Sequence, residues 1–254
     1  MSNHWETFPC TIGEHAAFIT YDHGVRTELE ALPFQNVARF EVALKQPDER
    51  GLPHGDEFAW LNELEDKIAE ELTEAKAISV GRVTTNGRRY IFYYTTQDQA
   101  TSEAIARRLA ASHGYEVAVL HTVDLERSHY WNQLFPTDDD WQVIQDMRVE
   151  DSLRDNGDPL TDPRQVEHWA YFHTDADRQR FIEAVKDQFD AIELYETPDC
   201  ERGAFTAKLA HTSLPDHRSI NKFTMLLNRS AKQAGGDYDG WETSVCRPET
   251  ANDT

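Results

Sequence analysis

Apolar residues in the first half of the 254-residue chain either alternate over short stretches or recur at helical spacing. Asp56 can cap a helix whose apolar side chains follow at three- and four-residue steps, the spacing of one helix face. Asn86-Gly87 separates two strand-like runs and is typical of a type I′ hairpin turn. In chain order, the pattern predicts strands at 17–21 and 37–45, a helix from 56 to about 72, strands at 77–85 and 88–95, a helix at 98–113 and a strand at 115–123.

The second half repeats this alternation of patterns after an additional helix. That helix is expected at 138–155 and ends at Asn156-Gly157-Asp158-Pro159, because glycine accepts a positive φ and proline cannot continue a helix. Thr174 is a suitable N-cap for a helix at 175–189. Further along, the pattern predicts strands at 166–173, 191–196 and 204–212, a helix at 216–234 that Gly235-Gly236 ends, and a last strand at 241–245.

Both halves therefore contain the order β-α-β-β-α-β, which is the ferredoxin-like supersecondary pattern. We expect an α+β fold of two tandem ferredoxin-like sandwiches with antiparallel sheets. Pro136 and the acidic run that follows it mark the boundary, which gives one α+β domain at 1–136 and a second at 137–247. Residues 248–254 are expected to form a disordered tail.

Two predicted strands are apolar on both faces. The strand at 166–172 places Val166, His168, Ala170 and Phe172 on one face and aromatic side chains on the other, and the strand at 90–94 is similar. A pair of helices covers only one face of a sheet. The second face must be covered by the helix at 138–155, by the other domain or by a partner.

Charge narrows the classes of function. The chain has 25 Lys and Arg against 46 Asp and Glu, a formal net charge of −21, of which residues 1–136 carry −9 and residues 137–254 carry −12. Both halves would repel phosphate backbones, so nucleic acid is an unfavourable partner. The acidity suits a protein partner with basic segments, or it serves solubility alone.

The sequence contains few signals for a cellular compartment or for a cofactor. No apolar run reaches the length of a membrane span, and the first residues lack the features of a secretory signal. Three cysteines without metal spacing indicate a reducing compartment, so we expect a cytoplasmic protein that needs neither a metal nor a cofactor.

The sequence contains no recognisable catalytic motif. His-Glu-x-x-His, Gly-x-Ser-x-Gly, Walker A and Gly-x-Gly-x-x-Gly patterns are all missing. Satisfied or exposed histidines are the favoured interpretation, and we expect no catalytic residues. An enzyme with a cleft between the domains stays an alternative, and it would need converging groups around His121, His129 and His168.

An RNA-binding module is a second alternative. In ferredoxin-like RNA-recognition modules, aromatic side chains of a central strand stack on bases. The corresponding strand here is aromatic and lies beside arginines, but it lacks the glycine-spaced RNA-recognition signature. Packing of this strand in a core is the favoured interpretation. The candidate RNA-binding residues are Arg82, Arg88, Arg89, Tyr90, Phe92 and Tyr94.

The segment 235–242 admits a structural and a functional interpretation. The structural one is favoured: the glycines end a helix, Asp239-Gly240 allows a tight bend, and Trp241 buries its ring with an N–H that needs a partner. The functional one makes Tyr238 and Trp241 an anchor beside acidic groups, a composition common in binding hot spots.

Residues 138–246 resemble the RraB family of regulators of ribonuclease E activity. The resemblance rests on the helix that ends in Asn156-Gly157-Asp158-Pro159, on Val166-Glu167-His168 before an aromatic strand, and on Tyr238-Asp239-Gly240-Trp241-Glu242. Residues from about 5 to 135 resemble a domain family of unknown function that is often fused to RraB-like domains. The motifs of that second resemblance are Arg50-Gly51-Leu52-Pro53, Leu64-Glu65-Asp66, Val80-Gly81-Arg82-Val83-Thr84 and the strand 90–95.

The RraB resemblance implies a non-catalytic protein inhibitor. Members of that family bind the ribonuclease and reduce RNA cleavage by the degradosome. The leading hypothesis is therefore an acidic regulator that binds a ribonuclease E-like protein through its basic segments, with no membrane association. The expected partner-binding residues are Glu167, Tyr238, Asp239, Trp241 and Glu242. Charge complementarity would speed association more than it increases affinity.

Overall fold

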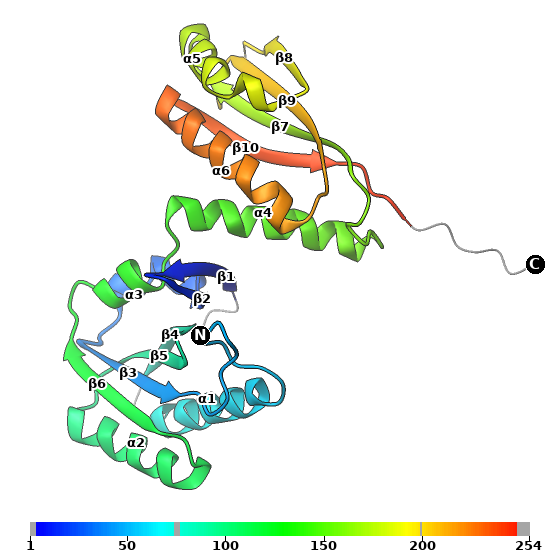
Figure 1. The fold of residues 1–254 in the computed structure, drawn as a ribbon. Coiled ribbons are helices and arrows are strands. Elements are labelled where there is room, and N and C mark those ends of the chain that lie inside the picture. The colour runs from blue at the N-terminus through cyan, green and yellow to red at the C-terminus, as the bar shows by residue number, and fades with distance from the viewer. Residues whose placement is uncertain (1–3, 74–76, 199, 248–254) are drawn as a thin grey trace, which may run out of the picture. The chain divides into compact units, whose positions relative to one another are not determined.

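The computed structural model describes residues 4–73, 77–198 and 200–247. The chain forms two compact units, Met1–Thr137 and Asp138–Thr254, each with mixed α and β content (Figure 1). The expected disordered tail at 248–254 lies outside the described residues. None of the helices in the described ranges has the length and apolar composition that a membrane crossing needs.

The first unit contains a six-stranded antiparallel sheet with the order β1-β2-β4-β5-β3-β6. Asn86 and Gly87 both have positive φ, as the type I′ hairpin requires, and Gly114 ends a helix in the left-handed conformation. The strands are β1 (Trp5–Ile12), β2 (His15–Asp22), β3 (Asn36–Ala43), β4 (Ile78–Thr85), β5 (Arg88–Thr95) and β6 (Val117–Val123), and the helices are α1 (Glu57–Thr73), α2 (Gln99–His113) and α3 (Ser128–Gln133).

The hydrophobic pattern did not predict β1 or α3. Phe8 is the one buried residue of β1, so the strand has almost no alternation to detect. Pro9 also interrupts its row of backbone N–H donors. Such a sequence is typical of a sheet edge. The six-residue α3 is too short to show a helical repeat.

Both faces of the first sheet carry buried side chains. One core under α1 and α2 takes its strand residues from β3 and β5, including Phe40 and Ile91, with Val117 and Val119 of β6 packed against it. On the opposite face, Tyr21 contacts Tyr130 of α3 and Phe135. The unit therefore covers its second apolar face with its own residues.

The second unit contains a four-stranded antiparallel sheet with the order β10-β7-β9-β8. In both sheets, the last strand of the β-α-β-β-α-β order pairs with the first, the first with the third, and the third with the second. The strands are β7 (Arg164–Phe172), β8 (Ala191–Glu196), β9 (Phe205–Ser213) and β10 (Gly236–Thr243), and the helices are α4 (Asp138–Asp155), α5 (Asp175–Val185) and α6 (His217–Ala234).

The last strand begins five residues earlier than predicted. Gly235 alone ends α6, with φ +84°, and Gly236 already pairs with Phe172 of β7. The bend expected at Asp239-Gly240 is a β-bulge, because the register shifts between Tyr238 and Gly240. The segment 236–243 is therefore a single bulged strand.

The helices of the second unit lie on one face of its sheet. Phe181 and Val185 of α5 and Leu227 of α6 share a core with Ala170 and Phe172 of β7. Leu153 of α4 packs nearby with Ile220 and Trp241. The helix α4 thus extends the existing helical layer instead of covering the opposite sheet face (Figure 1).

Candidate functional site

The five residues predicted to bind a partner lie on two neighbouring strands, β7 and β10. Glu242 pairs with Glu167 in the register, and Trp241 pairs with His168. Because side chains alternate across a strand, these pairs point to opposite faces of the sheet. The predicted set therefore divides between the helical face and the face away from the helices.

Tyr238 and Trp241 belong to the helical face, and each is only 6% exposed. The Tyr238 hydroxyl lies 2.7 Å from Nδ1 of His168, and the Trp241 indole N–H donates to Oδ1 of Asp146 at 3.1 Å. This confirms that the Trp241 ring is buried with a partner for its N–H. Neither ring projects from the surface as an anchor; both hold β10 against its neighbours.

The face away from the helices, called the open face below, is aromatic and acidic. Trp169 donates from its indole N–H to Glu242 at 3.0 Å, and its ring stacks on that of Tyr195 with 6.3 Å between the ring centroids. Lys208 lies over the Trp169 ring at 5.2 Å and pairs with Glu167 at 2.9 Å. The open face also carries Tyr171, Glu193 and Asp237.

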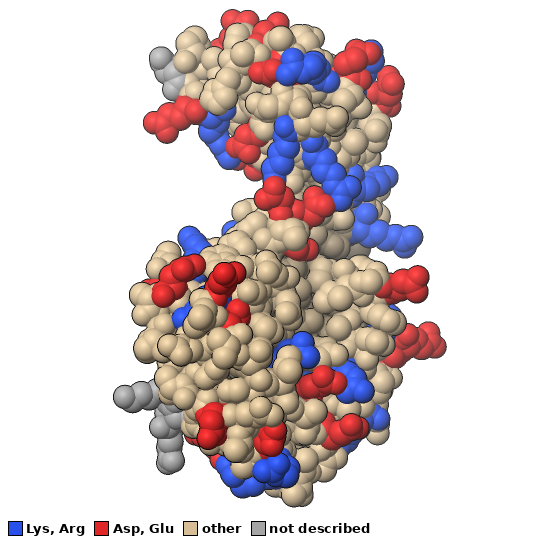
Figure 2. Space-filling model, turned by 90° about the vertical axis from the view of Figure 1, so that its left-hand side faces the viewer, with Lys and Arg blue, Asp and Glu red and all other residues tan. Residues whose placement is uncertain are grey.

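The bulge at Asp239 adds acidic groups at one end of this surface. Arg202 pairs with Asp237 at 3.1 Å and with Asp239, and its guanidinium lies over the Tyr171 ring. Figure 2 shows acidic and basic side chains interspersed on both units on the side in view. The open face thus combines stacked rings with carboxylates that are only partly neutralised.

A buried carboxylate fixes α4 to the rest of the unit. Asp146 is fully buried and accepts from Gln142 at 2.9 Å, from Thr224 at 2.6 Å and from Trp241. Burial raises the pKa of Asp146, while these donors lower it. The carboxylate ties α4, α6 and β10 together, so it has a structural role at this point.

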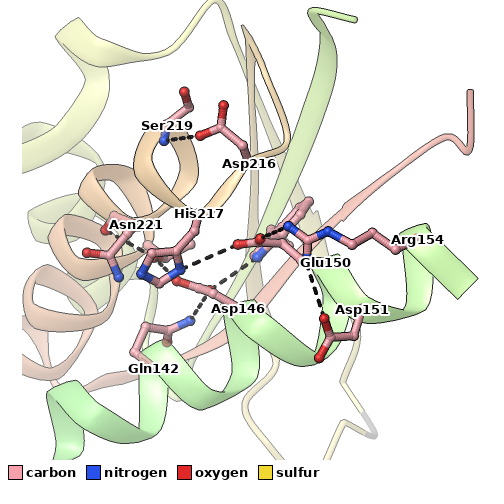
Figure 3. A network of polar contacts seen from close by, with 11 residues as sticks. Gln142, Asp146, Glu150, Asp151, Arg154, Asp216, His217, Ser219 and Asn221 are labelled. Carbon is pink, nitrogen blue, oxygen red and sulfur yellow. Dashed lines mark hydrogen bonds and ion pairs between the residues drawn. The ribbon is translucent and has the colours of Figure 1, made fainter. Parts of the chain in front are cut away.

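A second carboxylate continues the network along α4 (Figure 3). Glu150 is 2% exposed and pairs with Arg154 at 3.0 Å, and Nδ1 of His217 lies 3.4 Å from it. The contact with Glu150 raises the pKa of His217. Arg154 also pairs with Asp151 at 3.1 Å.

On the helical face of the second sheet, His168 and His211 form a buried row of contacts with Tyr238. Nε2 of His168 lies 3.2 Å from Nδ1 of His211, and the rings stack with 5.0 Å between centroids. Burial lowers the pKa of His168 to about 3 and that of His211 to about 4. Both rings are therefore neutral near pH 7 and act as packed hydrogen-bonding groups.

The structure contradicts base stacking on β5. Phe92 is 1% exposed and Tyr94 is completely buried, with its hydroxyl donating to Asp124 at 2.7 Å and Arg127 over its ring. Only Tyr90 is partly accessible, and Arg39 lies over its ring. Phe92 and Tyr94 are therefore core residues and cannot stack on bases.

The arginines of this candidate are also engaged with acidic or polar groups. Arg82 donates from Nη1 to both oxygens of Glu65, at 3.0 and 3.1 Å, and Arg88 pairs with Glu41. Arg89 is 3% exposed and donates to Thr84 and Asn62. They do not form a row of exposed cations suited to a phosphate backbone.

The histidines named for an enzyme belong to separate local networks. His121 contacts the Ser102 hydroxyl at 3.1 Å, whereas His129 lies 2.9 Å from Asp124. His168 is a core residue of the second unit. Within the residues described, no group of His, Cys, Asp and Glu is placed to hold a metal ion.

Sequence reasoning missed the centre of the open face. The alternation along β7 separated Trp169 and Tyr171 from the buried side chains, so this signal was available. The sequence contained no signal for the strand register that brings Lys208 and Glu193 close to Trp169. That register depends on the pairing of β9 with both β7 and β8.

Comparison with known proteins assigns both halves of the chain. The chain belongs to the family of unknown function DUF695, whose family model matches residues 3–135. The model of a second family, described as Regulator of ribonuclease activity B and abbreviated RraB, matches residues 143–243. These matches confirm both resemblances that were drawn from the sequence motifs.

Other comparisons add little. Among solved structures, the chain is similar to an unknown protein from Galdieria sulphuraria, with 9% sequence identity and a TM-score of 0.22. The similarity covers 83% of this chain and 99% of that protein. No curated protein sequence matches the chain.

Proposed function

We propose that this protein is a non-catalytic, cytoplasmic regulator that binds a ribonuclease E-like enzyme and reduces RNA cleavage. The observation that carries the proposal is the RraB match, which begins within α4 and extends to the end of β10. The matching strand order of both sheets also supports ferredoxin-like sandwiches.

The open face is the surface that we assign to the partner. Its exposed tyrosine and partly exposed tryptophan supply ring area at low conformational cost, and its carboxylates attract cations. Lys208 already lies over the Trp169 ring, which illustrates how a partner's Lys or Arg would bind there. A basic segment of the ribonuclease suits this chemistry.

The predicted partner-binding residues then take two roles. Glu167, Glu242 and Asp239 contact the partner directly. Tyr238 and Trp241 act from the opposite face of the sheet, where their hydrogen bonds hold β10 to His168 of β7 and to Asp146 of α4. Substituting the buried pair would weaken binding by disturbing the strand that presents Glu242.

A pull-down of ribonuclease E with the full chain tests the proposal. We expect retention at low salt that weakens at high salt, because ions screen exposed charges beyond about 10 Å at 0.1 M ionic strength. Adding the protein should also slow cleavage of an RNA substrate. Retention should fall in Trp169→Ala and Glu242→Gln.

Glu183→Gln is the matched control, since Glu183 is an exposed carboxylate on α5 that pairs with Lys186 outside the open face. It should bind like the unmodified chain. The proposal is wrong if the ribonuclease is not retained at low salt. Equal binding of all three variants would instead reject the open face as the docking surface.

A further inference from the structure

The first unit contains a cavity of about 580 Å³ that neither resemblance explains. It arises because the sheet is six strands wide, whereas the core under α1 and α2 takes its strand residues from β3, β5 and β6. Beyond that core, β4, β2 and β1 continue on the same side. The start of α1 and the loop at 48–55 form the walls of the space that remains.

The floor of the cavity is polar. Cross-strand pairing aligns Thr7 with Thr20, Thr20 with Arg82, and Thr84 with Arg89, so hydroxyl and guanidinium groups alternate along it. The hydroxyls of Thr7 and Thr20 are 3.0 Å apart. An apolar floor would be expected if a helix packed there, and these residues instead suit a hydrogen-bonding ligand.

The charge of the lining is positive in a strongly acidic protein. Its charged residues are Arg50, Arg82, Arg89 and Asp48, and because Arg50 pairs with Asp48 at 2.9 Å, the remaining positive charge belongs to Arg82 and Arg89. The Arg82 and Arg89 side chains are 31% and 4% exposed, and both approach Glu65 of α1. One carboxylate therefore faces two guanidinium groups, which leaves positive charge directed at the cavity.

The walls are apolar and partly exposed. Phe58 of α1 is 50% exposed and lines the cavity with Leu52 and Pro53, and Phe18 of β2, which is 42% exposed, adds a ring at the edge of the floor. Gly51 fixes this wall, because a Cβ there would lie 2.9 Å from the backbone of Asn86. Exposed rings beside a cationic floor offer a stacking surface for a ring and a charge partner for a negative group on the same ligand.

From this combination we infer that the cavity binds a small aromatic anion, with its phosphate or carboxylate held by Arg82, whose side chain is more accessible than that of Arg89, and its ring against Phe18 and Phe58. The volume is within the usual range for sites of small organic ligands. The motifs Arg50-Gly51-Leu52-Pro53 and Val80-Gly81-Arg82-Val83-Thr84 meet at this site. The inference is independent of the ribonuclease.

Isothermal titration calorimetry of the full chain tests the inference with four probes: AMP, UMP, indole-3-acetate and inorganic phosphate. We expect at least one aromatic anion to bind with a dissociation constant below 1 mM, and inorganic phosphate to bind at least about tenfold more weakly because it lacks the ring. The preferred probe then distinguishes a phosphate ligand from a carboxylate ligand.

Matched variants locate the binding. Arg82→Gln should weaken the best probe by about tenfold or more, and Phe58→Ala by roughly fivefold. Arg88→Gln and Trp60→Ala should leave it unchanged, since Arg88 pairs with Glu41 and Trp60 is a similarly exposed ring on α1 outside the cavity. Absence of binding by all three aromatic anions, or equal losses in the control variants, would overturn the inference.

Discussion

Replacing Thr224 with valine tests whether the buried Asp146 carboxylate holds the second unit together. Thr224 is fully buried, and its hydroxyl donates to Asp146 at 2.6 Å. Valine keeps the shape of the side chain but removes this donor. A hydrogen bond to a charged group contributes about 1.5–3 kcal/mol, and the remaining donors, Gln142 and Trp241, both reach the other carboxylate oxygen. We therefore expect Thr224→Val to lower the free energy of unfolding of this unit by about 2 kcal/mol at pH 7.

The loss should depend on pH in a defined direction. Burial raises the folded-state pKa of Asp146 above 3.8, so the folded state binds a proton more tightly than the unfolded state. The ionised carboxylate needs its donors most, and the destabilisation should shrink as the pH falls through the folded-state pKa. Hydrogen exchange of α4 and β10 peptides in the full chain measures this, because about 2 kcal/mol corresponds to roughly 30-fold less protection.

Thr212→Val provides the control, because Thr212 is an exposed threonine on β9 and should tolerate valine with little change. If Thr224→Val loses less than about 0.5 kcal/mol, or loses the same amount at every pH, the hydrogen bond to an ionised Asp146 does not stabilise the unit as argued.

Two further predictions concern the backbone and the buried histidines. Gly203→Ala should destabilise the second unit by several kcal/mol and abolish its cooperative thermal transition, because the added Cβ would lie 2.4 Å from a backbone oxygen of β7. Gly13→Ala is the control: Gly13 has a positive φ but lies in open space, so this change should cost only about 1 kcal/mol. The depressed pKa values of His168 and His211, about 3 and about 4, mean that the unfolded state gains protons first as the pH falls below 6.5. Urea unfolding of the second unit, followed by hydrogen exchange of β7, should show a loss of roughly 2 kcal/mol for each histidine between pH 7 and pH 5, and a flat profile would contradict their burial as neutral rings.

Local structure was predictable wherever one stretch of chain contained the whole signal. The α4 helix matches its predicted limits, 138–155, and Thr174 accepts from the backbone N–H of Asp177 as an N-cap should. The start of β10 was not predictable in this way. Gly236 has little strand propensity, and its strand conformation depends on pairing with Phe172, more than 60 residues earlier.

The candidate sites show the same division. The sequence correctly favoured a buried β5, since its rings alternate on both faces. It did not reveal that α3 and the segment after it supply the cover, because a short aromatic stretch does not indicate which sheet it packs against. It also treated Tyr238 and Trp241 as possible surface anchors, whereas the pairing of β10 with β7 turns both toward Asp146 and His168.

By itself, the sequence determined the element order, the acidity of both halves, the hairpin at Asn86-Gly87 and the two families, since each depends on composition, spacing or local motifs. The tertiary structure decided which rings are buried, which carboxylates share the open face with Trp169, and where Arg82 and Arg89 meet an uncovered part of the sheet. The physical reason is that burial and charge pairing follow from strand register and from the number of strands that two helices can cover. Strand register and strand number both depend on pairing between residues that lie far apart along the chain.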